Sequence, residues 1–166
     1  MIPEEQYEVT YSSGRGGTAT ATYVDKIALV NLNQEGQEEN ATVLRIREVS
    51  GARTIGKASG GYYEYRYANT GKSSYIIMND LDENFDKAPE AKLHAITSIS
   101  DANTILYQVK DGSVQKSYMF GRPGSKKATR FSMVGDATFN EATDTYATIV
   151  VSGENKQARI AWVKLD

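Results

Sequence analysis

The 166-residue chain contains no cysteine and only one histidine, His94. It therefore has no disulfide bond, thiol nucleophile or zinc–thiolate site, and it cannot offer two imidazoles to one metal. The Gly-x-Ser-x-Gly motif of a nucleophilic serine is also missing, and no apolar run is long enough to cross a bilayer. These absences favour binding or assembly over catalysis, so we expect neither enzyme activity nor a cofactor.

The charges of the chain are nearly balanced overall but segregated along the sequence. The formal net charge is −2, which gives no general attraction to nucleic acid or to an anionic membrane. Residues 1–40 are mainly acidic, whereas residues 110–130 are mainly basic. Copies of the chain could therefore meet through complementary segments. The acidic start, Met1–Glu5, lacks the apolar centre of a signal peptide, so we expect a virion or cytoplasmic location unless a signal was removed.

Most of the chain has the pattern of short β-strands separated by turns. Residues 42–49 alternate most clearly, with Leu44 and Ile46 on one face. Asp111-Gly112 stands between two strand patterns and predicts a tight hairpin. About ten short strands can be traced, and at most one short helix is expected, near residues 88–95. We predict a single all-β domain over residues 1–166, a two-sheet antiparallel sandwich of jelly-roll-like type.

A stripe of tyrosines is the most suggestive candidate for a binding surface. Tyr63, Tyr65 and Tyr67 alternate along a predicted strand and so share one of its faces. A row of tyrosines can stack on sugar rings or nucleobases and offer hydroxyl groups. The same row also suits a packed core or a subunit interface, and these two interpretations come ahead of ligand binding.

Two arginines, Arg45 and Arg47, alternate on the strand that precedes these tyrosines in the chain. Basic side chains mixed with aromatic rings are typical of grooves that bind single-stranded nucleic acid. The net acidic charge of the chain argues against nucleic acid as a partner. We therefore treat the two arginines as binding candidates whose ligand is open.

An acidic loop carries oxygen ligands at alternate positions, as the start of a calcium loop does. The residues are Asp80, Asp82, Asn84 and Asp86. Phe85 stands where an EF-hand requires glycine, and Ala91 stands where it requires glutamate. We predict no metal site, and keep these four residues as a weak calcium candidate within a solvated loop.

Three further sequence patterns give only weak support for a phosphate-binding or catalytic site. The glycine-rich stretch 51–58 resembles a phosphate-binding loop but has Ala58 where that motif needs a hydroxyl group. His94 lacks a defined serine or aspartate partner. Glu48 and Glu64 lie on predicted strands, and a glycosidase that uses such a carboxylate pair is a possible enzyme alternative.

The sequence thus predicts a non-enzymatic structural or assembly protein, a subunit of a virion such as a capsid-decoration, tail or neck protein. Its expected partners are copies of itself or other subunits, acting through sheet faces and edges. The first alternative is a carbohydrate-binding module that uses the tyrosine stripe. The second is a β-domain that binds single-stranded nucleic acid.

Overall fold

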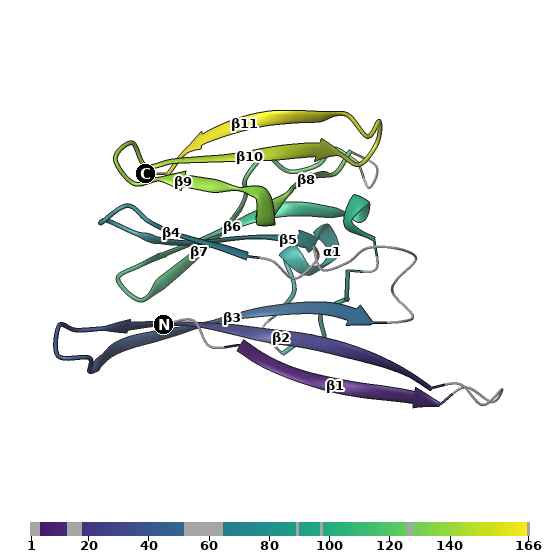
Figure 1. Ribbon diagram of the computed structural model, residues 1–166, viewed down its shortest axis with the longest axis horizontal. Coiled ribbons are helices and arrows are strands. Elements are labelled where there is room, and N and C mark those ends of the chain that lie inside the picture. Colours follow the sequence, from purple (N-terminus) through teal and green to yellow (C-terminus); the bar gives the residue numbers. More distant parts are fainter. Residues whose placement is uncertain are drawn as a thin grey trace.

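The computed structural model describes residues 4–12, 18–51, 65–88, 90–96, 98–125 and 128–165. Three antiparallel sheets, here named A, B and C, are stacked as layers in chain order (Figure 1). The predicted all-β, antiparallel fold is confirmed, with three sheets where two were expected. Within sheets A and B the neighbouring strands are consecutive in the chain, so these sheets are meanders without the Greek-key order of a jelly roll.

Sheet A contains β1 (Glu4–Ser12), β2 (Thr18–Leu32) and β3 (Glu38–Gly51), in that order. Strand β2 runs without a break through a 15-residue segment that contains several threonine and valine residues. Its register with β1 shifts at one point: Gln6 pairs with Val24 and Glu5 pairs with Lys26, so Asp25 is an extra residue of the β-bulge type. The bulge keeps Val24 and Ile27 on the same buried face although they are three residues apart.

Sheet B forms the middle layer, with β4 (Tyr65–Asn69), β5 (Ser74–Leu81), β6 (Ala102–Lys110) and β7 (Ser113–Tyr118). The predicted hairpin between β6 and β7 is confirmed. Asp111 and Gly112 both have positive φ, 49° and 75°, which is the requirement of the tight turn that suits the twist of the strands.

Sheet C contains β8 (Arg130–Ser132), β9 (Thr138–Asn140), β10 (Thr145–Ser152) and β11 (Ala158–Lys164). Strand β10 pairs with β11 on one side and with both β8 and β9 on the other. A 3-10 turn over Val134–Asp136 separates β8 from β9.

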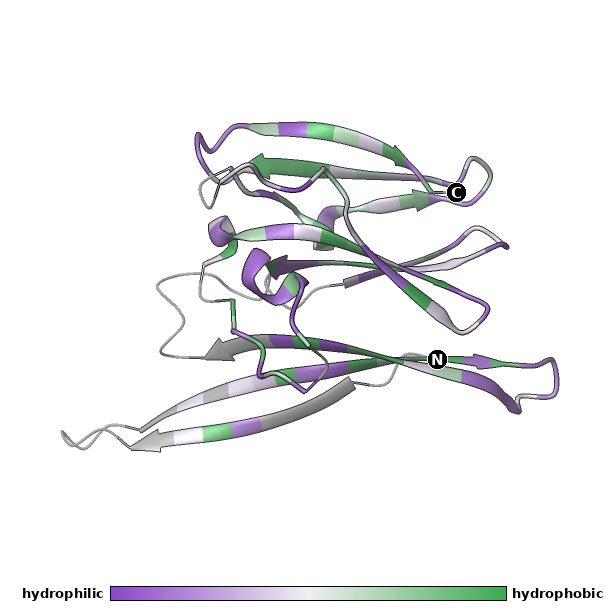
Figure 2. Cartoon of the chain, turned by 180° about the vertical axis from the view of Figure 1, so that it is seen from behind, coloured by the Kyte–Doolittle hydropathy of each residue, from purple (hydrophilic) through white to green (hydrophobic). Residues whose placement is uncertain are grey.

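The middle sheet is covered on both faces, and this creates two cores. Toward sheet A, Ile76 and Met78 of β5 pack with residues such as Ile27 and Leu44. Toward sheet C, Tyr75 and Ile77 pack with residues that include Tyr146 and Leu165. Successive residues of β5 enter opposite cores, so nearly the whole strand is buried. Figure 2 shows the hydrophobic segments that run through the stacked layers.

The helix predicted near residues 88–95 is wrong. The α-helix in the described chain, α1 (Asp82–Phe85), is one turn long and directly follows β5, whereas the described residues among 88–95 are not helical. Tertiary contacts stabilise a non-helical conformation of this segment instead. The Arg45 guanidinium donates to the carbonyl oxygens of Ala88 and Ala91 at 3.2 and 2.5 Å. No helix in the described part of the chain has the length and apolarity needed to cross a membrane.

Candidate functional site

The predicted tyrosine stripe divides between a core and a groove. Tyr65 and Tyr67 of β4 pair with Met78 and Ile76 of β5, so both rings face sheet A. Tyr65 is partly buried and packs against the core between sheets A and B. Tyr67 lies farther along the strand, where its side chain is 41% exposed. Tyr63 lies outside the described residues.

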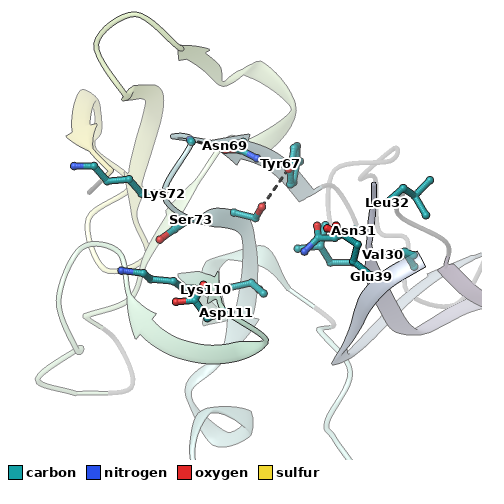
Figure 3. A pocket seen from close by; sticks show the side chains of 14 residues that line it. Val30, Asn31, Leu32, Glu39, Tyr67, Asn69, Lys72, Ser73, Lys110 and Asp111 are labelled. Carbon is teal, nitrogen blue, oxygen red and sulfur yellow. Dashed lines mark hydrogen bonds between the residues drawn. The ribbon is translucent and has the colours of Figure 1, made fainter. Parts of the chain in front are cut away.

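Tyr67 lines a groove of about 650 Å³ between the outer ends of sheets A and B (Figure 3). One side of the groove comes from the β2–β3 hairpin, including Asn31 and Glu39. The other comes from the turns of sheet B, including Lys72 and Asp111. The groove thus combines one aromatic ring with charged and amide side chains, a composition that fits a small polar ligand.

Hydrogen bonds hold the aromatic side of the groove in place. The Asn69 amide donates to the Tyr67 hydroxyl at 3.1 Å, and that hydroxyl lies 3.2 Å from Ser74 Oγ. The backbone N–H of Gly71 donates to Asn69 Oδ1 at 2.6 Å, which fixes the amide in turn. The Tyr67 ring is therefore preorganised, so a ligand that stacks on it would cost little side-chain ordering.

Arg45 and Arg47 do not join Tyr67 in one site. They lie on the face of β3 opposite the buried Leu44 and Ile46. Arg47 forms an ion pair with Asp25 at 3.0 Å, and Arg45 donates to backbone carbonyls of the segment after α1. Both arginines thus have partners within the fold, since the Arg47 guanidinium also lies 5.1 Å from the centre of the Tyr23 ring, and neither arginine lines the groove at Tyr67.

The calcium candidates also point to different partners. Asp80 is buried, and its Oδ1 accepts hydrogen bonds from the Asn84 amide at 2.7 Å and the Leu81 N–H at 2.8 Å. Asp82 accepts a hydrogen bond from the Tyr118 hydroxyl, while Asp86 binds Arg122 at 2.7 Å. No cluster of three or more acidic, histidine or cysteine side chains suited to a metal occurs in the described part of the chain.

An ion pair that the sequence did not reveal joins Asp80 to Lys116 of β7, with 3.6 Å between Oδ2 and Nζ. Burial raises the pKa of Asp80, against the opposing effects of the Asn84 amide and the Lys116 charge. Burial likewise lowers the pKa of Lys116, against the attraction of Asp80. The Lys116 ammonium also lies 4.9 Å from the centre of the Phe85 ring. The ion pair joins β5 to β7 within sheet B, and the contact of Lys116 with Phe85 adds α1, so the pair has the character of a structural contact.

Tyr118 completes this structural cluster. Its ring stacks on Phe85 with 4.1 Å between centroids. Burial, followed by the hydrogen bond to Asp82, raises the pKa of its hydroxyl. The hydroxyl is therefore a donor that stays protonated rather than a general base.

His94 and the glutamates form no described catalytic group. His94 is exposed, and its Nε2 lies 3.9 Å from Glu83 Oε2, without a serine between them. Glu48 belongs to β3, where its backbone pairs with Val24, and Glu64 lies outside the described residues. The glycine-rich stretch 51–58 also lies outside them, apart from Gly51 at the end of β3.

The outer face of sheet C is the second candidate surface. Ile160 and Trp162 of β11 are 63% and 68% exposed, and Ile149, opposite Ile160 on β10, is 39% exposed. The neighbouring residues of both strands, such as Tyr146 and Val163, point to the core. The alternation of β11 was visible in the sequence, but which of its faces is buried was not.

No protein-family model matches the chain, no curated protein matches it, and no solved structure matches its fold. The groove at Tyr67 and the outer face of sheet C are therefore the observations from which a function can be inferred.

Proposed function

We propose that the chain is a non-enzymatic structural protein that assembles through the outer face of sheet C. The observation that carries this proposal is the exposure of Ile160 and Trp162, next to the partly exposed Ile149. Large apolar side chains gathered on one face of a folded domain are typical of a surface that contacts another protein. Tryptophan is also among the residues that contribute most to protein interfaces.

The free energy available from covering this face is substantial. A tryptophan side chain has roughly 200 Å² of surface, and burial contributes about 25 cal/mol per Å². Covering Trp162, which is 68% exposed, would therefore contribute on the order of 3 kcal/mol before the costs of association. The proposed setting is the one expected from the sequence, a subunit of a virion or a comparable assembly that contacts its own copies and its neighbours.

Sedimentation velocity over a wide range of concentration tests this function. We expect the protein to form larger species as its concentration rises, and we expect Trp162→Ser to suppress them. Val43→Ser is the matched control, since Val43 is a 56% exposed apolar residue in sheet A. A wild-type protein that stays monomeric at millimolar concentration would refute the proposal.

The groove supports a second candidate function, the binding of a carbohydrate. Its specific support is the preorganised Tyr67 ring beside amide, hydroxyl and charged groups. Screening on a broad glycan array tests it, with Tyr67→Ala expected to abolish any binding and Val43→Ser expected to leave it intact. Nucleic-acid binding has less support, because Arg45 and Arg47 already contact groups within the fold.

A further inference from the structure

Strand β11 differs from the other edge strands in lacking features that discourage pairing with another chain. Its seven residues pair with β10 without a register shift, and it contains neither proline nor glycine. Natural edge strands are usually protected by shortness, by irregular register or by inward-pointing charge. β11 is neither short nor irregular in register, and Arg159, its charged residue on the core-facing side, is exposed.

Each of the other edge strands in the described chain has a feature that discourages pairing with another chain. β1 has an irregular register with β2 between Glu5 and Gln6, and β3 has two such irregularities. β4 has five residues, while β8 and β9 have three each. β7 carries Lys116, whose charge points inward to Asp80. The contrast marks β11 as the edge that is open to a further strand.

The open edge lies directly beside the apolar face. β11 has a strand neighbour on one side only, so alternate backbone N–H and C=O groups along it point away from the sheet. Ile160 and Trp162 stand on this same strand and are exposed on its outer face. A strand added at this edge would satisfy the backbone and cover part of the apolar surface at the same time.

The sequence of β11 is complementary to itself around Ala161. In an antiparallel pair centred there, Ile160 lies opposite the partner's Trp162, and Trp162 lies opposite the partner's Ile160. Pairs of an aromatic and a β-branched residue across strands are favourable. Arg159 meets the partner's Val163, so no like charges are directly opposed.

Neighbouring registers fit less well. A shift of two residues toward the carboxyl end would set Ile160 opposite the partner's Lys164. A shift of two residues the other way would set Trp162 opposite the partner's Ala158 and would leave Lys164 beyond the start of the partner's strand. Odd shifts would place exposed side chains of one copy opposite core-facing side chains of the other.

We propose that β11 pairs antiparallel with β11 of a second copy, with the two-fold axis at Ala161, so that sheet C continues across a dimer. This inference rests on the proposed assembly function and specifies its partner and its contact. A two-fold contact of this kind is closed, since each copy uses its β11 edge once. Larger assemblies would then require other surfaces of the dimer.

Disulfide trapping tests the register, and the absence of native cysteine makes the result unambiguous. Ala161→Cys is expected to form a disulfide-linked dimer under mild oxidation, because directly paired residues have Cα atoms about 4.5–5.5 Å apart, within disulfide range. Ala158→Cys alone is the matched control. Its two copies would be six residues apart along the strands, about 20 Å, which is too far to link.

A second pair of variants keeps the test valid if Ala161→Cys disturbs the fold. Ala158 and Lys164 are both exposed and should tolerate substitution. A mixture of Ala158→Cys and Lys164→Cys proteins is expected to yield the mixed disulfide dimer, since these residues are opposed in the proposed register.

The outcomes separate the inference from the function on which it rests. Linkage at Ala161 and in the mixed pair, with Ala158→Cys alone unlinked, supports the dimer. Association by sedimentation without linkage at either site overturns this register and leaves assembly through another contact. A protein that remains monomeric throughout overturns both proposals.

Discussion

Strands β5 and β11 are built from similar residues but have opposite surroundings. Each is a short strand that contains isoleucine and an aromatic residue. Tyr75 and Ile77 of β5 are 2% and 0% exposed, whereas Trp162 and Ile160 of β11 are 68% and 63% exposed. The difference shows that the number of covering layers, rather than residue type, decides burial here. The same substitution should therefore affect folding in β5 and association in β11.

The largest expected effect comes from truncating the middle layer. Ile77→Ala should lower the free energy of unfolding by about 4 kcal/mol, because it removes a fully buried side chain from the core between sheets B and C. Ile160→Ala is the matched variant in β11 and should change stability by less than about 0.5 kcal/mol. Urea denaturation of dilute protein measures both. Equal losses would show that the Ile160 side chain is covered within one chain.

A buried charge in the middle sheet gives the next largest effect. Lys116→Met leaves Asp80 without its cation and should cost about 3 kcal/mol at neutral pH. Burial already raises the pKa of Asp80 in the folded state, and loss of Lys116 raises it further. The folded variant then holds a proton that the unfolded chain releases, so its stability should fall as the pH rises from the normal carboxylate range through that raised pKa.

Denaturation curves at several pH values, which give the free energy of unfolding, test this prediction. The difference between Lys116→Met and wild type should be small in acid, where Asp80 is protonated, and full at neutral pH. The double variant Asp80→Asn, Lys116→Met should recover most of the loss. A cost that is independent of pH would indicate lost packing of the lysine stem rather than an unpaired carboxylate.

The smallest expected effect concerns a buried hydroxyl between sheets B and C. Thr104 Oγ1 lies 3.0 Å from Asn79 Oδ1 and accepts a hydrogen bond from the Ser132 N–H at 2.7 Å. Thr104→Val preserves the shape of the side chain but removes its hydrogen bonds to Asn79 and Ser132, so it should cost about 2 kcal/mol. Thr138→Val, at an exposed position of sheet C, should change stability by less than about 0.5 kcal/mol. Similar effects for both variants would deny this hydroxyl a role in joining the two sheets.

Local patterns predicted individual strands well. The alternation over residues 42–49 correctly placed Leu44 and Ile46 on one face, and the structure shows that this face is buried, with both residues 3% exposed and Val43 on the other face. The hairpin at Asp111-Gly112 follows from backbone conformations that few other residue pairs adopt readily. Such features depend on neighbouring residues, so the sequence displays them directly.

Features that depend on contacts between distant segments were harder to predict from the sequence. The helix near residues 88–95 failed because Arg45, far away in the chain, binds the carbonyl oxygens that a helix would have used. The apolar residues 75–78 follow one another without alternation, which is a sign of burial on both faces. This run of apolar residues indicates that both faces of the strand are covered, but it does not show that the second cover is a third sheet. The separation of Tyr65 from Tyr67 depends on where sheet A ends over sheet B, and this also lies beyond local pattern.

The stacking of the sheets in chain order has a consequence for biosynthesis. Each sheet is formed by successive segments, so its strands can pair before the next sheet has left the ribosome. Sheet A emerges first and displays its apolar face until β5 and β6 arrive, and sheet B waits in the same way for sheet C. The order of the sheets along the chain therefore allows them to fold one after another during synthesis.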